Sequence, residues 1–247
     1  MELAGQTALV TGAGRGIGAA IARQLAMAGC DLALVDIDAA GGMEPLAQEL
    51  RASGRRAIAL ASDVSSMAAA EESVAAVLRE FGRLDILVCN AGITRDAMVW
   101  KMTEQAWDEV MAVNLKGCFT CCHAVAPVLR GQRRGRIITI ASINGLRGKV
   151  GQANYAASKA GVMALTKSLA RELGPSGVTV NCVAPGFIRS TMTARLPAEI
   201  ISTAIAETAL GRLGEPEDVA RVVAFLCSEG ARHITGEVIK VDGGQYM

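Results

Sequence analysis

A glycine-rich segment near the start of the chain constrains the fold more than any other feature. Residues 11–18 read Thr-Gly-Ala-Gly-Arg-Gly-Ile-Gly. They follow an apolar run, Thr7–Val10, and lead into an amphipathic run, Gly16–Ala28. Glycines in a turn from strand to helix let backbone amides approach a pyrophosphate, and the helix N-terminus favours the anion. Ile17 occupies the third glycine position of the plain Gly-x-Gly-x-x-Gly pattern, so the glycines follow Thr-Gly-x-x-x-Gly-x-Gly instead. The segment predicts a dinucleotide-binding turn, with a tight turn that holds no ligand as the alternative.

Short apolar runs alternate with longer amphipathic ones along the rest of the chain. After Thr7–Val10, strands are predicted at Leu32–Val35, Ala57–Ala61, Ile86–Cys89, Arg136–Ala141, Val178–Val183 and Glu237–Val241. After Gly16–Ala28, helices are predicted at Met67–Phe81, Tyr155–Leu173 and Pro216–Cys227. This alternation indicates βαβ units and a parallel sheet. We expect residues 1–247 to form a single α/β domain, a doubly wound (Rossmann) seven-stranded sheet in a three-layer αβα arrangement, with a small substrate lid near 190–215.

Composition and charge disfavour several classes of function. The formal net charge is only +1, and the basic run Arg130–Arg136 is short, as is typical of a solvated loop, so we expect no nucleic-acid partner. The chain shows neither a signal peptide nor a stretch near the ~18 consecutive apolar residues of a membrane span. We therefore expect a cytoplasmic protein with no membrane association.

The seven cysteines are odd in number, and several lie in apolar runs, such as Cys89 and Cys182. Buried free thiols fit this pattern better than a disulfide framework. The segment Cys118–His123 contains three cysteines and a histidine, but the sequence shows no second ligand cluster, and the segment falls in an expected helix. We therefore predict helix packing there and no bound metal.

An aspartate at the end of the second predicted strand bears on the choice of nucleotide. Asp36 follows the glycine-rich turn by about 20 positions, where a carboxylate accepts hydrogen bonds from a ribose 2′-hydroxyl and repels a 2′-phosphate. Arg15 opposes this reading, because a guanidinium beside the turn is able to reach a phosphate. Asp36 carries more weight, since it lies where the 2′-phosphate must go, and we expect NADH to be preferred over NADPH. A capping aspartate without a ligand is the alternative.

A tyrosine and a lysine four residues apart open the predicted helix Tyr155–Leu173. This spacing places the Tyr155 phenol and the Lys159 ammonium on one helical face, where a cation favours the phenolate. Such a pair is suited to general acid–base catalysis near neutral pH. Ser142, at the end of a predicted strand, is placed to hydrogen-bond a substrate oxygen. Taken alone, Tyr-x-x-x-Lys is a weak signal, and the glycine-rich turn upstream gives it weight.

In this combination and order of motifs, the chain resembles the short-chain dehydrogenase/reductase family over essentially its whole length. The matching motifs are Thr11–Gly18, Asp63-Val64, Asn90-Ala91-Gly92, Asn114, Ser142, Tyr155-x-x-x-Lys159, Pro185-Gly186 and Asp242-Gly243-Gly244. The resemblance implies an oxidoreductase that moves a hydride between a nicotinamide and a secondary alcohol or ketone carbon.

The resemblance also implies a role for each matching residue. Tyr155 would donate the proton in reduction, Lys159 would lower the Tyr155 pKa and hold the nicotinamide ribose, and Ser142 would position the carbonyl. Asn114 would support a water that links Lys159 to solvent. The implied cofactor contacts, among them Ile188 and Thr191 at the nicotinamide carboxamide and phosphates, are Gly12, Arg15, Gly16, Ile17, Gly18, Asp36, Asp63, Val64, Asn90, Ala91, Gly92, Tyr155, Lys159, Pro185, Gly186, Ile188 and Thr191. The implied substrate contacts are Ser142, Gln152 and Phe187.

Within the family, the segment Asn90–Asp96 is similar to 3-oxoacyl-thioester reductases that act on acyl-carrier protein or on acetoacetyl-CoA and that mostly use NADPH. Ser176 stands where the carrier-protein enzymes often have a basic docking residue, whereas Arg133 matches a second docking position. Gln152 matches a substrate-side glutamine of the acetoacetyl-CoA reductases. We expect a 3-hydroxyacyl/3-oxoacyl couple, with CoA favoured over a carrier protein. A cyclic or simple secondary alcohol is the alternative substrate.

Two other functional classes remain as alternatives. A binding protein built on an inactive dehydrogenase would lack Tyr155 or Lys159, and both are present. A nucleotide-sugar epimerase shares Tyr-x-x-x-Lys but usually extends further at its C-terminus. The family resemblance also implies a homotetramer, with helices near Ala106–Arg130 and Tyr155–Leu173 forming one interface and the C-terminal strand another.

Overall fold

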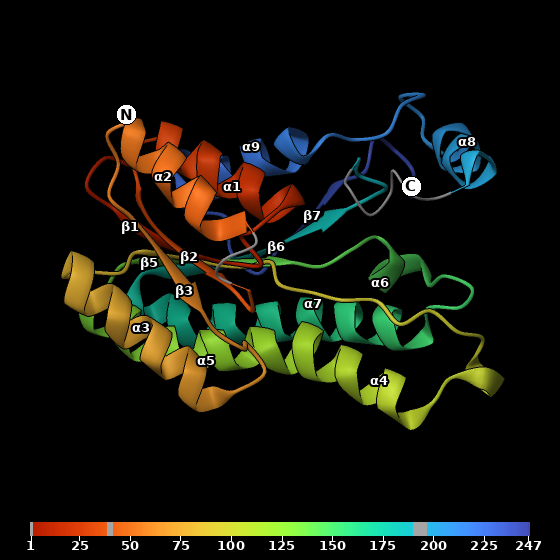
Figure 1. Ribbon diagram of the computed structural model, residues 1–247, viewed down its shortest axis with the longest axis horizontal. Helices are drawn as coiled ribbons and strands as arrows, with labels where there is room; N and C mark the ends of the chain where they lie inside the picture. The colour runs from red at the N-terminus through yellow and green to blue at the C-terminus, as the bar shows by residue number, and fades with distance from the viewer. Residues whose placement is uncertain (1, 39–41, 190–196) are drawn as a thin grey trace.

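The computed structural model describes residues 2–38, 42–189 and 197–247, and they form a three-layer α/β domain around one sheet (Figure 1). All seven strands are parallel, in the order β3-β2-β1-β4-β5-β6-β7. The expected doubly wound sheet is therefore confirmed. The strands are β1 Thr7–Thr11, β2 Asp31–Asp36, β3 Ala57–Ala61, β4 Ile86–Cys89, β5 Gly135–Ile140, β6 Val178–Pro185 and β7 Val238–Val241.

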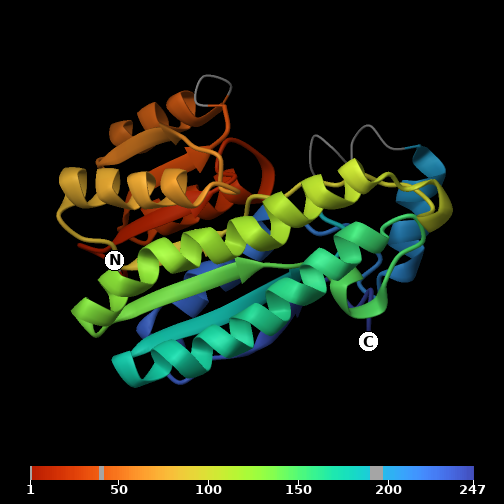
Figure 2. The same cartoon turned by 90° about the horizontal axis from the view of Figure 1, so that it is seen from below.

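Helices cover both faces of the sheet, so the central strands are buried on both sides. Helices α1 (Gly16–Met27), α2 (Glu44–Ala52) and α9 (Pro216–Cys227) share one apolar cluster with one face. Helices α3 (Met67–Phe81), α5 (Gly117–Gln132) and α7 (Ala153–Leu173) share a second cluster with the other face, as Figure 2 shows from that side. The strands β4, β5 and β6 are buried along their whole length, which explains why Ile, Val and Leu recur in them on both faces.

The helical run Glu104–Gln132 joins α4 (Glu104–Val110), a π-helical turn (Met111–Lys116) and α5. By length and composition it is apolar enough to cross a membrane, with a mean hydropathy of 1.3 over 18 residues, of which 44% is buried. The core helix of a soluble protein passes the same test. In the structure, α5 packs against α3, α7 and β4, and its buried residues belong to the second apolar cluster. The apolar character of the run therefore has a packing role in this fold.

Sequence reasoning missed three α-helices of the described residues. It left α2 and the four-residue α6 (Asn144–Arg147) unassigned, and it treated 190–215 as irregular, whereas α8 (Ala198–Glu207) occupies the middle of that segment. Residues 190–196 of the expected lid lie outside the described part of the chain. Helix α8 and the short helix α6 (Asn144–Arg147) lie at the end of the molecule that holds the C-terminus (Figure 2).

Candidate active site

The strand order reverses between β1 and β4, which places a crevice at their carboxyl ends. The chain leaves β1 toward α1 on one face and leaves β4 toward α4 and α5 on the other. Ligands of open α/β sheets bind at such a switch point. The glycine-rich segment forms the turn from β1 to α1 there, as the sequence predicts.

Two glycines of this turn have no room for a side chain. Gly12 has a positive φ of 62°, and a Cβ there would lie 2.8 Å from the Ala91 Cα atom. A Cβ on Gly18 would overlap the Gly12 carbonyl oxygen. The turn therefore presents bare backbone at the N-terminus of α1, which is the arrangement that binds a pyrophosphate.

Thr11 and Asn90 fasten this turn to the end of β4. The Thr11 hydroxyl accepts hydrogen bonds from the backbone N–H groups of Asn90, at 3.0 Å, and Ala91, at 3.1 Å. The Asn90 amide donates to the carbonyl oxygens of Thr11 and Gly12, each at 3.0 Å. Sequence reasoning expected Asn90 to line the cofactor and missed the support that it gives to the turn. The sequence feature that could have indicated this support is Thr11, which directly precedes the first glycine of the turn.

Asp36 lies beside the glycine-rich turn at the end of β2. One carboxylate oxygen accepts the Gly14 N–H at 3.1 Å, and the other accepts the Ile37 N–H at 2.8 Å. The side chain is half-buried, whereas Arg15 is exposed at the start of α1. The acidic group therefore lies directly at the turn.

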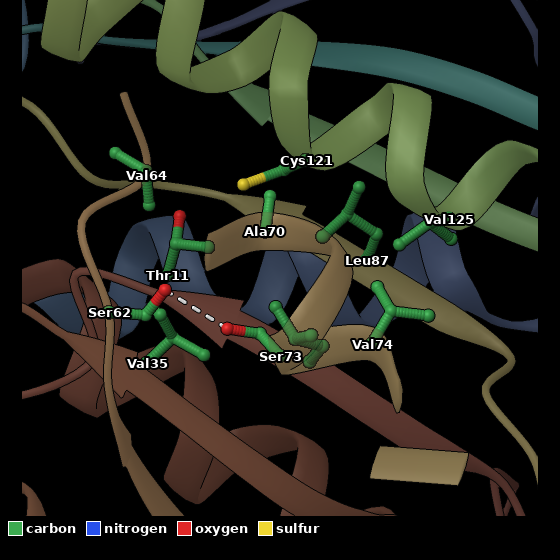
Figure 3. A pocket seen from close by; sticks show the side chains of 11 residues that line it. Thr11, Val35, Ser62, Val64, Ala70, Ser73, Val74, Leu87, Cys121 and Val125 are labelled. Carbon is green, nitrogen blue, oxygen red and sulfur yellow. Dashed lines mark hydrogen bonds between the residues drawn. The ribbon is translucent and has the colours of Figure 1, made fainter. Parts of the chain in front are cut away.

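Asp63 and Val64 follow β3 but point in different directions. The exposed Asp63 carboxylate accepts hydrogen bonds from the N–H and hydroxyl of Ser65. Val64 is buried and lines a small cavity between the sheet, α3 and α5 (Figure 3). Aliphatic side chains form most of that cavity, and the Ser73 hydroxyl donates to Ser62 at 3.0 Å. Because its hydroxyls already have partners, we interpret this cavity as a gap in packing.

Ser142 and Tyr155 meet at the carboxyl end of β5. Ser142 follows β5, and its hydroxyl accepts the Asn144 N–H at 3.1 Å. Tyr155 lies in the first turn of α7, and its side chain is hydrogen-bonded to that of Ser142. Two residues that are 13 positions apart are thus brought together, as the sequence analysis expects.

Lys159 and Asn114 lie next to this pair in the interior. The Lys159 ammonium donates to the Ile140 carbonyl at 2.8 Å and lies 5.7 Å from the centre of the Tyr155 ring. Asn114 comes from the π-helical turn, a feature that often marks functional sites. A Cβ on Gly92 would lie 3.3 Å from both the Asn114 Oδ1 atom and the Lys159 Nζ atom. All four residues of the expected catalytic set therefore line one small region.

The Asn114 side chain is fully engaged with protein groups. Its amide oxygen accepts the Ile93 N–H at 2.8 Å, and its nitrogen donates to the Ile93 carbonyl and the Ser158 hydroxyl. These bonds fix the Asn90–Ile93 segment against α7. The expected water linked to Asn114 stays a prediction.

The two titratable groups of the site have shifted pKa values. Burial raises the pKa of Tyr155, while its hydrogen bond with Ser142 lowers it and the nearby Asp96 carboxylate raises it further. Burial lowers the pKa of Lys159. Burial of the phenol is therefore the largest influence on the Tyr155 pKa, and the expected lowering of this pKa by Lys159 stays a prediction.

Gln152 and Asn154 position the start of α7. The Gln152 amide donates to Asp96 at 2.8 Å and accepts from Asn144 at 3.0 Å, so both ends of this expected substrate contact already have partners. Asn154, which sequence reasoning missed, is fully buried and donates to the carbonyl oxygens of Arg95 and Ala106. These bonds hold Tyr155 in place, and only the folded contacts reveal them.

The segment after β6 forms one wall of the site. The Pro185 carbonyl accepts the Ile143 N–H at 3.0 Å, and Gly186 packs so closely that a Cβ would lie 2.7 Å from the Asp242 Cβ atom. Ile188 is buried. Phe187 lines a broad hollow together with the loop 147–150 and α8. Thr191, the remaining expected cofactor contact, lies outside the described residues.

The cysteines are all free and buried. Cys89, the last residue of β4, lies against Cys118 and Cys122 of α5, and the three sulfur atoms are within 4.8 Å of one another. Sequence reasoning found no second ligand segment for Cys118–His123, because β4 meets this helix only in the fold. His123 itself is exposed and lies 3.9 Å from Glu71.

Comparisons with known proteins agree with this geometry. Residues 12–245 match the protein-family model described as enoyl-(acyl carrier protein) reductase. The 3-oxoacyl-[acyl-carrier-protein] reductase FabG of Staphylococcus epidermidis is 46% identical over 242 residues, covering 98% of this chain and 99% of that protein. The protein of the same name from Vibrio cholerae is 45% identical over 247 residues, covering 100% of each chain. A solved structure from Sinorhizobium meliloti, provisionally named a short-chain alcohol dehydrogenase, superposes with a TM-score of 0.95 at 36% identity, covering 99% of this chain and 97% of that one.

Proposed function

This chain belongs to the short-chain dehydrogenase/reductase family, and we propose that it is an NAD(H)-dependent reductase of 3-oxoacyl thioesters carried on an acyl-carrier protein. The observation that carries the proposal is the convergence of Ser142, Tyr155 and Lys159 beside the nucleotide-binding turn. The names of the relatives from Staphylococcus epidermidis and Vibrio cholerae support the thioester substrate.

The proposed mechanism assigns each polar group one task. A bound nicotinamide supplies the hydride that adds to the C3 carbonyl carbon. Ser142 donates a hydrogen bond to the carbonyl oxygen and so stabilises the negative charge that develops there. Tyr155 transfers its proton to that oxygen, which completes the 3-hydroxyl group. Lys159, held by the Ile140 carbonyl, stabilises the tyrosinate left behind.

The sequence analysis favoured CoA over a carrier protein, whereas the names of the relatives favour the carrier, and we propose the carrier. A direct test compares acetoacetyl-carrier protein with acetoacetyl-CoA, each with NADH, in steady-state kinetics. We expect kcat/KM to be at least about tenfold higher for the carrier-bound substrate, since docking adds contacts that CoA lacks. Equal or better use of CoA would overturn the carrier assignment. Oxidation of simple secondary alcohols without any thioester turnover would favour the alcohol dehydrogenase alternative, which the name of the Sinorhizobium structure supports.

The NADH preference rests on the Asp36 carboxylate beside Gly14. The Asp36→Asn variant removes the charge, and its single amide oxygen still accepts one of the two N–H groups, from Gly14 and Ile37, that the carboxylate binds. We expect its kcat/KM for NADPH to rise about tenfold or more, since a hydrogen bond or repulsion that involves a charged group contributes about 1.5–3 kcal/mol. Steady-state kinetics with both nucleotides measures the change. A wild-type enzyme that already prefers NADPH would contradict the proposal and make Arg15 the deciding residue.

We also propose a homotetramer, and the place of Arg133 supports an assembly of several copies. Arg133 directly follows α5 as its C-cap residue. Its guanidinium donates to the Pro175 carbonyl, beside the C-terminal end of α7. Tyr155 lies at the opposite end of α7, roughly 27 Å away along the helix. A carrier protein docked at Arg133 would therefore serve an active site on another copy.

Exposed apolar side chains on the helical run Glu104–Gln132 support the same proposal. Trp107 and Phe119 are 39% and 44% exposed on this run, and Trp100 just before it is 72% exposed. Large exposed aromatic groups are typical of contact surfaces. We expect light scattering to give the mass of four chains, and Phe119→Asp to lower that mass. A wild-type monomer in solution would refute the assembly.

We also propose that the segment near 190–215, which contains α8, is a small lid over the substrate site. Helix α8 faces the loop 147–150 across the hollow that Phe187 lines. The hollow combines the apolar side chains of Val150, Phe187 and Ile200 with charged groups of both signs, among them Lys149 and the pair of Arg147 with Glu207 at 3.2 Å. The apolar side chains suit an acyl chain, and Lys149 offers a cation to the anionic group that carries it.

A further inference from the structure

Three cysteine side chains form a compact cluster beneath the proposed active site. Cys118 and Cys122 are one turn apart on α5, so their side chains share a face. Cys89 reaches this face from the end of β4, and its Sγ atom lies 3.9 Å from that of Cys122. Within the described ranges, no other group of three cysteine, histidine, aspartate or glutamate residues offers ligand atoms so close together.

The spacing of the sulfur atoms suits a soft metal ion. Thiolates bound to one zinc ion at about 2.3 Å lie about 3.8 Å apart in a tetrahedral arrangement. The Cys89–Cys122 distance is already 3.9 Å, and the third sulfur lies within 4.8 Å of both, so small side-chain rotations would complete the set. Soft thiolate ligands select ions such as zinc over magnesium or calcium. Three protein ligands leave a fourth position for a small exogenous ligand.

The charge balance also favours a divalent ion. Three thiolates and one divalent cation carry a net charge of −1, which is costly in a buried site unless a cation lies nearby. The Lys159 ammonium is buried and lies within electrostatic range of Cys89 and Cys118. This ammonium would compensate the negative charge.

We propose that Cys89, Cys118 and Cys122 bind one thiophilic divalent cation, zinc or cadmium, and that the bound ion inhibits the enzyme. On binding, each thiol releases its proton to solvent and its sulfur forms one bond to the metal. Cys89 directly precedes Asn90, which fastens the glycine-rich turn, and Cys118 lies one turn beyond Asn114. An ion that draws the three sulfurs together therefore displaces the segments that contain Asn90 and Asn114. The negative charge of the metal–thiolate cluster also attracts the Lys159 ammonium.

Cys121 provides a matched control on the same helix. Its side chain is as buried as that of Cys118 and lines the cavity of Figure 3, and although its thiol also interacts with that of Cys89, it does not belong to the set of three sulfurs that lie within 4.8 Å of one another. Cys121→Ala therefore removes a buried thiol without removing a ligand, whereas Cys122→Ala and Cys118→Ala each remove one ligand.

The test is a cadmium titration of the full chain, reduced and then freed of reductant under argon. We expect the ultraviolet thiolate-to-cadmium absorption to saturate at one equivalent in the wild type and in Cys121→Ala. Cys122→Ala and Cys118→Ala should bind at least tenfold more weakly. Because two ligand variants are used, a folding failure in one leaves the other as the test. Absence of a one-equivalent endpoint, or an unchanged endpoint in both ligand variants, would overturn the site.

Inhibition is the second readout, and it rests on the proposed function, whereas the absorption does not. One equivalent of cadmium should lower the reductase rate of the wild type and of Cys121→Ala at least tenfold, and a chelator should restore it. A saturated absorption with an undiminished rate would refute inhibition while leaving the metal site in place. If the chain reduces no thioester, the absorption titration still decides whether the site exists.

Discussion

Replacing Tyr155 with phenylalanine is expected to lower kcat/KM for thioester reduction by about 10²–10⁴-fold, the range that a positioned general acid contributes. The ring keeps its place in the first turn of α7, because the Asn154 bonds that hold this turn do not involve the hydroxyl. The variant lacks only the proton donor and the hydrogen bond to Ser142. Steady-state kinetics with the preferred nucleotide measures the loss.

The pH dependence gives the same prediction an independent readout. Because burial raises the pKa of Tyr155, the phenol stays protonated through neutral pH. Reduction by the wild type should therefore be flat through neutrality and fall only as the pH rises past this elevated pKa. Oxidation of the product, which requires the phenolate, should increase over the same range. Tyr155→Phe should show neither dependence in its residual rate.

The second tyrosine of the chain supplies the control. Tyr246 lies near the C-terminus, where the Lys240 ammonium is 5.2 Å from its ring centre; its backbone N–H donates to the Asp242 carboxylate, and its backbone carbonyl accepts from Lys240. Tyr246→Phe removes the same atom as Tyr155→Phe and should retain the activity of the wild type within about twofold. Comparable losses in both variants, or no loss in Tyr155→Phe, would exclude Tyr155 as the proton donor.

The sequence predicts this fold well where local pattern and final burial coincide. The β3 and β4 strands and the α3 and α9 helices begin and end where the sequence places them. Helix α9 has a proline in its first turn and an acidic capping pair, Glu215 and Asp218, so its start is encoded locally. Helix α8 was missed because its three isoleucines and one threonine, all β-branched, weaken its helical signal, and its placement depends on packing over the hollow.

The site is predictable only in part, for a related reason. Motifs such as Tyr155-x-x-x-Lys159 consist of residues close together in the chain, so they are visible in the sequence. The bonds between Asn90 and Thr11 join residues 79 positions apart, and no local spacing reveals them. The Cys89 thiol likewise meets α5 only after β4 and α5 pack together. The raised Tyr155 pKa has the same origin, because burial depends on the complete fold.

Replacing Lys159 with methionine is expected to lower kcat/KM about 10²–10³-fold, the cost of removing one preorganised electrostatic group from an active site. Methionine has nearly the same length, so the 4% exposed side chain still fills its place. The variant loses the cation that stabilises the tyrosinate and the hydrogen bond to the Ile140 carbonyl. Because the family resemblance also assigns Lys159 to the nicotinamide ribose, we expect KM for NADH to rise as kcat falls.

The thermal stability of this variant should respond to pH in a defined direction. Burial lowers the pKa of Lys159 below its usual value of 10.5, so between the two values the unfolded chain binds more protons than the folded one. The wild type therefore gains stability from this group as the pH rises toward 10.5, and Lys159→Met lacks that gain. We expect the Tm of the variant minus that of the wild type to be largest near neutral pH and to shrink on going alkaline. Lys167→Met, an exposed position on the same helix, should show no such trend. A difference that widens with pH would mean that the Lys159 charge stabilises the fold, and its loss of activity would then have to be separated from unfolding.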